Sequence, residues 1–475
     1  MGVTCLPRWS VGRNVLSLAA CMAIAASTRA EAPAGPWRQY ASLDQAGWST
    51  ARIAEARAIA EANLSGAVLA VHRGHVVIAW GDVDRPFKCH SVRKSFMSAL
   101  YGPFVEDGTI DLTMTIADLG IDDREGLTDA EKQATIADLL SSRSGIYHTA
   151  AKETDGHRDT RPERGSHTPG THFWYNNWDF NIAGVIFEQL TGRKIFEEFQ
   201  RRFATPLGME DYDLADMRYE LEPMNSDHTA YAFRMSARDA ARFGWLFAEG
   251  GEWNGERILS EAWIDRCTAM HSDLGDGRGY GLMWWVYPAG GWGEDSTRPV
   301  LNRYHKFAAL GTGGQTILVV PEAEFVFVHR VDTDNGREVG GVPVWDMAEL
   351  VLSAFSGDSA DEPELMPLTP EPFEHSLPVP PRKKAIALDP AVYEDYVGVY
   401  EVQPGVEVTV QVFQDRLFAS MTGEGAGEFL PESETKFFLE ARNAITLEFQ
   451  RGDDGAVSAV VVSAPGQQVT AKRIK

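Results

Sequence analysis

Cysteines are scarce in this chain, too scarce to build a disulfide scaffold. Only four occur among 475 residues, and two of them, Cys5 and Cys21, lie near the N-terminus. The other two, Cys89 and Cys267, would pair in an oxidising compartment or stay as two buried free thiols, and the sequence leaves both open. A chain of this length has room for two or more domains, each stabilised by its own hydrophobic core.

Basic residues are also in deficit. The chain has 44 Lys and Arg against 68 Asp and Glu, which gives a formal net charge of −24. This acidic balance disfavours nucleic acid and anionic membrane surfaces as partners. Hydrophobic residues make up 44% and charged residues 24% of the chain, so its composition is that of a folded globular protein.

Long apolar runs are missing as well. No stretch reaches about 18 apolar residues, so no transmembrane segment is predicted. A shorter apolar run, 15–26, follows Arg8 and Arg13 and precedes small residues, which predicts a signal peptide over residues 1–30. The mature protein is then exported, periplasmic or secreted. Two alternatives stay open: processing at Cys21, which would leave a lipid-anchored protein, and an uncleaved cytoplasmic chain.

Ser91 and Lys94 stand three residues apart, ahead of apolar residues at helical spacing (96–101). On a helix, positions i and i+3 share one face, so the Lys94 amine would lie beside the Ser91 hydroxyl. A desolvated lysine with a lowered pKa can activate a serine, and a free N–H at a helix N-terminus can bind an oxyanion. The same Ser-x-x-Lys spacing recurs at 433–436, so the motif alone identifies nothing.

Tyr175 and Asn177 follow a polar stretch, 148–170, which predicts a long loop of the kind that borders a site. A phenol can exchange protons with a lysine–serine pair, and an amide can bind both a lysine and a substrate carbonyl. The alternative is that Tyr175 and the neighbouring tryptophans are core aromatics.

Further along, residues 279–286 read as a strand, and the apolar runs at 315–321 and 325–329 predict a β-hairpin. The glycines at 311–314 lead into this β-rich run instead of opening a helix, which argues against a dinucleotide-binding loop. No cluster with metal-ligand spacing is evident, so neither a metal nor an organic cofactor is predicted. Residues 356–384 read as a Pro-rich, acidic linker, and short β segments over 385–475 predict a small β-sandwich or barrel.

Taken in order, these motifs resemble the serine β-lactamase-like hydrolases. That family includes class C β-lactamases, D,D-peptidases, carboxylesterases and 6-aminohexanoate-dimer hydrolases. The matching segments are Ser91-Val-Arg-Lys94, Leu139–Ile146, Pro169-Gly170, Tyr175-Asn-Asn177, Pro206–Met209 and Gly311–Gln315. The resemblance implies an α+β fold over residues 33–355, with an antiparallel sheet flanked by helices and an all-helical subdomain. The small C-terminal all-β domain resembles one often appended to such hydrolases.

The resemblance also implies roles. Ser91 would be the acylated nucleophile and Lys94 its proton acceptor or relay. Tyr175 would be the general base and acid, and Asn177 would orient Lys94 and the substrate. The backbone N–H groups of Ser91 and Thr312 would form the oxyanion hole. Which of Lys94 and Tyr175 takes the proton stays open.

One departure from the family bears on the substrate. Penicillin-recognising members carry Lys-Thr-Gly where this chain has residues 309–311, Ala-Leu-Gly. Without that lysine an anionic substrate lacks a charge-assisted partner, unless Arg303 or Lys306 replaces it. The ending Gly-Gly-Gln315 and the pair Tyr147-His148 look closer to the 6-aminohexanoate-dimer hydrolase and esterase branch. Candidate substrate contacts are Tyr147, Gly311, Gly313 and Gln315.

The sequence therefore predicts a serine hydrolase that cleaves a small-molecule ester or linear amide through an acyl-enzyme on Ser91. Two alternatives are kept: a β-lactamase or D,D-peptidase, and an inactive binding homologue. The individual substrate and the oligomeric state are left open.

Overall fold

The computed structural model describes residues 1–2, 35–357, 363–376, 383–423, 425–439 and 444–475. The predicted signal peptide, apart from its first two residues, and the alternative anchor site at Cys21 lie outside this part of the chain. Within it, no helix combines the length and the apolar character needed to cross a membrane.

The N-terminal domain combines helices with short and long strands. Its helices are α1 (Thr50–Ala62), α2 (Arg93–Glu106), α3 (Ile116–Leu119), α4 (Ile136–Leu140), α5 (Asp155–Thr160), α6 (Asn177–Thr191), α7 (Ile195–Phe199), α8 (Ala237–Ala248), α9 (Glu261–Thr268) and α10 (Gly341–Ser353). Its strands are β1 (Arg38–Tyr40), β2 (Ala67–His72), β3 (His75–Gly81), β4 (Phe87–Lys88), β5 (Arg218–Glu220), β6 (Ala230–Ala232), β7 (Arg234–Met235), β8 (Glu252–Trp253), β9 (Glu256–Arg257), β10 (Ser272–Asp273), β11 (Gly279–Tyr280), β12 (Trp285–Tyr287), β13 (Lys306–Gly311), β14 (Gln315–Val320), β15 (Phe325–Arg330) and β16 (Leu365–Pro367).

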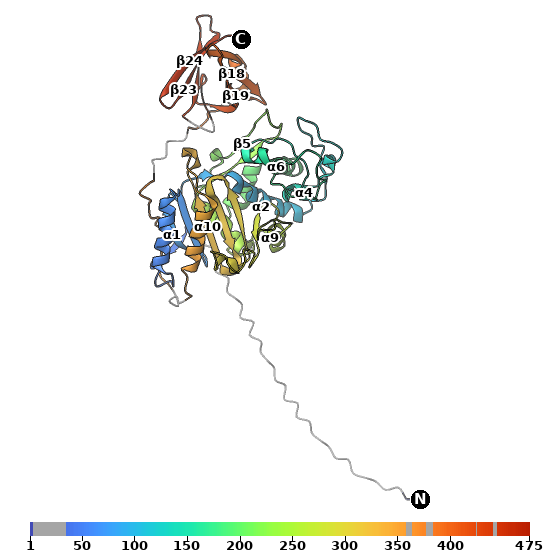
Figure 1. The fold of residues 1–475 in the computed structure, drawn as a ribbon, viewed down its shortest axis with the longest axis vertical. Helices are drawn as coiled ribbons and strands as arrows, with labels where there is room; N and C mark the ends of the chain where they lie inside the picture. The colour runs from blue at the N-terminus through green and yellow to red at the C-terminus, as the bar shows by residue number, and fades with distance from the viewer. Residues whose placement is uncertain (3–34, 358–362, 377–382, 424, 440–443) are drawn as a thin grey trace.

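A ten-stranded sheet in the order β10-β11-β12-β13-β14-β15-β2-β3-β1-β16 forms the centre of this domain. Its strand pairs are antiparallel except for β1, which lies parallel to β3. Helices α1 and α10 cover one face (Figure 1), and α8 packs against the other through β2, β14 and β15. The predicted α+β fold is thereby confirmed, with a sheet that is mixed instead of wholly antiparallel.

Both faces of the sheet are buried, which explains the continuous apolar runs seen in the sequence. Along β2, Leu69 and Val71 point into the core beneath α2 and α8, whereas Val68 and Ala70 belong to the core beneath α1 and α10. Between β4 and β5 the chain contributes helices and loops without strands, and these form the predicted helical subdomain. Cys89 and Cys267 are both free and buried.

The C-terminal domain is a closed antiparallel barrel, which decides between the two architectures left open. Its strands are β17 (Gly398–Gln403), β18 (Val406–Phe413), β19 (Arg416–Met421), β20 (Gly427–Pro431), β21 (Lys436–Leu439), β22 (Thr446–Arg451), β23 (Val457–Ala464) and β24 (Gln467–Arg473). Pairing of Tyr400 on β17 with Arg473 on β24 closes the barrel. A 3-10 helix, η9 (Pro390–Tyr396), precedes the first strand.

Two segments differ from the sequence-based expectation. The stretch predicted as a linker, 356–384, contributes β16, which pairs with β1 and extends the sheet. The run expected as one strand, 279–286, is instead the hairpin of β11 and β12, because Met283 adopts a left-handed backbone (φ 65°) that turns the chain.

Candidate active site

Ser91 lies in a single 3-10 turn, η1 (His90–Val92), directly before α2. The preceding residue, His90, has a left-handed backbone (φ 47°), which is uncommon outside glycine. Its Nε2 atom is 2.8 Å from Thr333 Oγ1, and this hydrogen bond ties the turn to the segment after β15. The sequence placed Ser91 on the first turn of the helix; the structure places it one step earlier, with the same neighbour across the turn.

Lys94 supplies that neighbour. Its Nζ atom is 2.8 Å from Ser91 Oγ. The side chain is only 2% exposed. Burial lowers the pKa of Lys94 well below its usual value, and the charge of Arg93 lowers it further. A lysine held in this way loses its proton more readily than an exposed one, and an uncharged amine can accept the proton of the serine hydroxyl.

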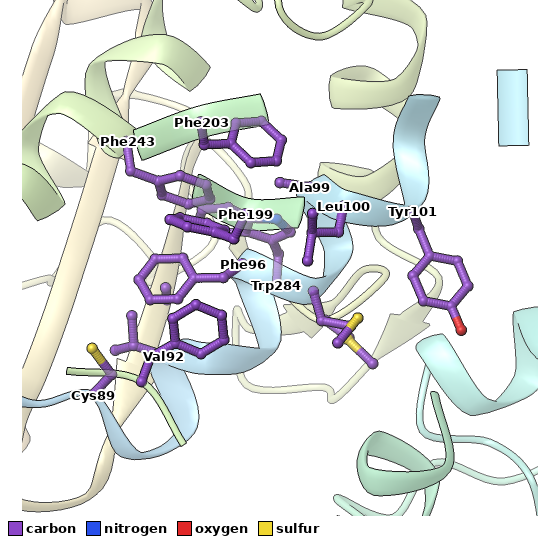
Figure 2. Packing of buried hydrophobic residues seen from close by; sticks show 14 of the residues in the cluster. Cys89, Val92, Phe96, Ala99, Leu100, Tyr101, Phe199, Phe203, Phe243 and Trp284 are labelled. Carbon is purple, nitrogen blue, oxygen red and sulfur yellow. The ribbon is translucent and has the colours of Figure 1, made fainter. Parts of the chain in front are cut away.

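The other faces of α2 fix this pair in place. Phe96 packs against Phe199 and Phe243, with ring centroids 5.2 and 4.8 Å apart. Figure 2 shows these rings with Trp284 and Leu100 in one cluster around the helix. Such close packing leaves the helix little freedom to shift, so the distance between Ser91 and Lys94 is set by the core.

Tyr175 lies over the lysine, in the loop that precedes α6. Lys94 Nζ is 4.8 Å from the centroid of its ring. On another side the ring stacks on Trp285, at a centroid distance of 5.4 Å. Burial raises the pKa of Tyr175 to about 12, although a hydrogen bond with Ser91 acts in the opposite direction. The phenol therefore stays protonated at neutral pH and can donate a proton at the site.

Asn177 is the first residue of α6 and is buried. Its Nδ2 atom donates a hydrogen bond to the backbone oxygen of Lys152 at 2.9 Å. Its Oδ1 atom is buried and has no hydrogen-bond partner within the described part of the chain. The amide is thus held by the loop before α5 and leaves an acceptor available at the site. An unpaired buried acceptor is costly, and a ligand can satisfy it.

The end of β13 lies against the turn that carries Ser91. A Cβ atom at Gly311 would come within 2.4 Å of Cys89 O and 3.2 Å of Ser91 N, so only glycine allows this approach. Thr312 follows and lines the same pocket as Ser91. Gly313 has a φ of 79° and turns the chain into β14. The backbones of Ser91 and Thr312 thereby lie at one corner, where an oxyanion hole needs two N–H donors.

Ser91, Lys94, Asn177 and Thr312 line a pocket of about 360 Å³, whereas Tyr175 contacts Lys94 but is not part of the pocket lining. Polar and charged side chains dominate its wall, and residues from several elements contribute: Lys88, His90, Ser91, Arg93, Lys94, Lys152, Glu153, Thr154, His157, Asn177, Asp216, Arg218, Glu220, Glu222, Arg234 and Thr312. The long polar loop predicted to border a site does so through Lys152, Glu153, Thr154 and His157. The His157 ring lies 5.4 Å from that of Tyr175. Only the loop's composition pointed to these residues.

None of the four candidate substrate contacts is part of the pocket lining: Gly311 and Gly313 flank Thr312, which is, and the other two make contacts elsewhere. Tyr147 is buried, and its hydroxyl is 3.0 Å from His167 Nδ1. Gln315 is fully buried, and its Nε2 atom donates to the backbone oxygen of Val331 at 2.7 Å. Its amide therefore joins β14 to the segment that follows β15.

Arg303 and Lys306, the suggested replacements for the missing lysine, also lie away from the Ser91 pocket. Lys306 begins β13 and pairs with Tyr287, whereas Gly311 ends the strand beside Ser91. Neither Arg303 nor Lys306 lines the pocket. Among the cations that line the pocket, Lys88 and Arg234 both pair with Asp334, at 3.2 Å and 2.6 Å.

Two family models and a curated relative match this chain. A model of the beta-lactamase family matches residues 50–341, and one described as a domain of unknown function (DUF3471) matches residues 382–473. A penicillin-binding protein of Bacillus subtilis (strain 168) is 38% identical over 326 residues, which cover 65% of this chain and 68% of the relative.

A solved structure shares the fold. A provisional 6-aminohexanoate-dimer hydrolase from Bacillus anthracis superposes with a TM-score of 0.50 at 19% identity, covering 69% of this chain and 88% of that one. An octameric penicillin-binding protein homologue from Pyrococcus abyssi covers 88% of this chain and 99% of its own, with a TM-score of 0.47 at 17% identity. The chain belongs to the beta-lactamase family, whose members are serine hydrolases.

Proposed function

We propose that this protein is a serine hydrolase that cleaves esters or linear amides through an acyl-enzyme on Ser91. The observation that carries the proposal is the 2.8 Å contact between Ser91 Oγ and the buried amine of Lys94. A serine without such a neighbour is a weak nucleophile. The pocket beside it, of about 360 Å³, has room for a small acyl group.

In this mechanism Ser91 Oγ attacks the substrate carbonyl carbon while its proton passes to uncharged Lys94. The negative charge that develops on the carbonyl oxygen is bound by the backbone N–H groups of Ser91 and Thr312. Tyr175, whose pKa is raised to about 12 by burial, donates a proton to the leaving alcohol or amine and is reprotonated from Lys94. Water then attacks the acyl-enzyme by the same route in reverse, which releases the acid and frees Ser91.

The test is a substrate panel: p-nitrophenyl esters, a linear p-nitroanilide and a chromogenic cephalosporin. Ser91→Ala is expected to lower kcat/KM on the preferred substrate by at least about a thousandfold, because the covalent route is lost. Ser433→Ala is the matched control, since Ser433 has the same spacing to a lysine but accepts a hydrogen bond from the Lys436 backbone in a turn. Equal turnover by wild type and Ser91→Ala contradicts the proposal. Ser91-dependent turnover excludes an inactive binding homologue.

Penicillin binding is the second candidate, favoured by the 38% identity with a penicillin-binding protein. Against it, Ala309 stands where a penicillin-recognising member has its lysine, and Ala309 is buried in the core. We therefore expect no adduct on intact protein exposed to a penicillin or a cephalosporin. A mass increase that disappears in Ser91→Ala would instead establish the second candidate.

We also propose that residues 1–30 direct export and are removed, and that residues 33–355 and 385–475 are the catalytic and the C-terminal domain. The export signal is inferred from the apolar run after Arg8 and Arg13. The two domains are inferred from the positions of the two family matches. N-terminal sequencing of the protein recovered from a bacterial periplasm tests the cleavage. A mature chain that starts at a lipid-modified Cys21 would replace cleavage near residue 30.

A further inference from the structure

The C-terminal barrel is packed at one end and hollow at the other. At the packed end, Tyr396 stacks on Phe449 with ring centroids 4.2 Å apart, and Phe437 lies 5.7 Å from Phe449. Tyr396 ends the 3-10 helix η9, so this helix contributes to the packed end. Aromatic side chains fill this part of the interior, as side chains do in small barrels.

The hollow end holds a cavity of about 540 Å³, within the range of ligand pockets. Inward-facing apolar side chains from several strands line it, among them Val408, Ala419, Met421, Phe429, Leu439 and Leu447. A barrel of this strand number can enclose one small ligand when its interior is left unfilled. The lining favours an apolar ligand, because a polar group buried there without a hydrogen-bond partner would weaken binding.

The open end of the barrel adjoins the catalytic domain. Figure 1 shows β5 next to the barrel end that carries β18 and β19. Arg416 of β19 donates a hydrogen bond to the backbone oxygen of Tyr219 at 2.6 Å. Leu221, the residue after β5, is 4% exposed and lines the barrel cavity. The catalytic domain therefore forms part of the cavity wall.

Three residues line both the barrel cavity and the Ser91 pocket: Lys152, Glu220 and Glu222. Lys152 Nζ lies 3.7 Å from Glu220 Oε1 and 3.8 Å from Glu222 Oε1, so the charges at this boundary are paired. Lys152 also holds Asn177 through its backbone oxygen. The two cavities are thus neighbours, and the three residues at their boundary belong to the wall of both.

We propose that the hollow end of the barrel binds the aliphatic chain of the substrate while its carbonyl group reacts at Ser91. The assignment rests on the proposed hydrolase function and narrows its substrates to esters or amides with a long, unbranched, uncharged acyl chain. The polar Ser91 pocket holds the reacting group, and the apolar cavity removes the chain from water. Each buried methylene group then improves kcat/KM by up to about fourfold.

The first experiment measures kcat/KM on p-nitrophenyl acetate, butyrate, octanoate and decanoate with the full-length protein. Wild type is expected to prefer the longer chains. Ala419→Phe, which fills the cavity, should abolish this preference, with a loss of about tenfold or more on decanoate and unchanged acetate turnover. Gln411→Phe is the matched control, because Gln411 is exposed on β18 and the same ring is added outside.

The second experiment measures binding without turnover. Ser91→Ala protein is titrated with 1-decanol, and displacement of an environment-sensitive apolar dye is followed. Binding is expected to disappear when Ala419→Phe is added. It should weaken with Leu439→Gln, at a half-buried position where a polar side chain is less disruptive to folding than at a core site.

The results separate the two proposals. Acetate turnover that depends on Ser91, with no chain-length preference or a preference that Ala419→Phe leaves intact, overturns the barrel assignment alone. Decanol bound at the barrel without any effect of Ala419→Phe on ester turnover also overturns it, because the ligand would then be a separate molecule. Absence of Ser91-dependent turnover on every ester and amide overturns the hydrolase proposal and the substrate assignment together.

Discussion

The two ends of β13 each lie beside a buried lysine, and the two lysines have different surroundings. Lys94 is next to the end of the strand at Gly311, and Lys306 is its first residue. Their side chains are 2% and 0% exposed. Burial lowers the pKa of both, for Lys306 to about 8 with Glu349 acting in the opposite direction.

The difference lies in what each amine contacts. Lys306 Nζ donates to the backbone oxygen of Tyr304 at 3.2 Å and lies 4.0 Å from the centroid of the Trp292 ring. Lys94 Nζ contacts a serine hydroxyl beside an open pocket. Burial therefore accounts for a lowered lysine pKa at both ends, and reactivity additionally requires a nucleophile within hydrogen-bond distance and room for a substrate.

Replacing the two lysines in parallel is the strongest test of this contrast. Lys94→Met should lower kcat/KM on the preferred ester by about a thousandfold, because the serine loses its proton acceptor. Lys306→Met, with the same change in side chain, should keep turnover near the wild-type value. Circular dichroism checks that both variants fold. Equal losses in the two variants would show that a buried lysine matters here for structure alone.

Tyr175→Phe tests the proton donor at the Lys94 end. Loss of the phenol should lower kcat by about a hundredfold for substrates with a poor leaving group. The effect should be smaller for p-nitrophenyl esters, whose leaving group needs no proton. Tyr147→Phe is the control, because it removes a hydroxyl bonded to His167 outside the pocket. A comparable loss in Tyr147→Phe would place the second tyrosine in the site after all.

The pair Asn176 and Asn177 separates structure from binding. Asn177→Ala should raise KM by about tenfold, since its buried Oδ1 has no partner in the described part of the chain, and it also loses the stabilising hydrogen bond from Nδ2 to the Lys152 backbone oxygen. Asn176→Ala should lower the free energy of unfolding by about 1 kcal/mol without raising KM, because Asn176 caps α6 by accepting from the Trp178 N–H. Steady-state kinetics and urea unfolding on both variants measure the two effects. The reverse assignment of effects would contradict the geometry.

The last prediction concerns Lys306 and the pH dependence of stability. Its folded pKa of about 8 is below the unfolded value of 10.5, so between these pH values the unfolded chain binds more protons. The free energy of unfolding should therefore gain a contribution as pH rises from about 8 toward 10. Lys306→Met removes this contribution, whereas Lys472→Met, at an exposed position, retains it. Parallel slopes for all three proteins would mean that Lys306 titrates normally.

Local geometry made part of the site predictable. Ser91 and Lys94 are three residues apart, and a helical turn brings such positions together whatever the surrounding fold. The hairpin of β14 and β15 was also predictable from local sequence, because two apolar runs flank a short turn. Tyr147 and Gln315 were expected at the substrate, but the direction of a side chain in a loop or at a strand end is decided by the neighbouring segment. For Gln315 that segment is the backbone at Val331.

Long-range pairing explains the other differences. Strand β16 could not be predicted from its Pro-rich stretch, because its three residues form a strand only by pairing with β1. Strand β24 is rich in polar residues and lacks a clear alternation, yet it closes the barrel against β17. The cavity that β18 and β19 share with the catalytic domain depends on the docking of Arg416 at Tyr219. No local pattern encodes that contact.

By itself, the sequence determined that Ser91 and Lys94 are neighbours across one turn, the order of the motifs and the division into a mixed α+β part and a β-rich tail. These follow from spacing and periodicity, which act over a few residues. Only the tertiary structure decided which lysine meets a hydroxyl, which aromatic rings enclose it, and that the barrel opens beside the Ser91 pocket. Those features arise because packing brings together residues up to several hundred positions apart, and burial then sets their charge.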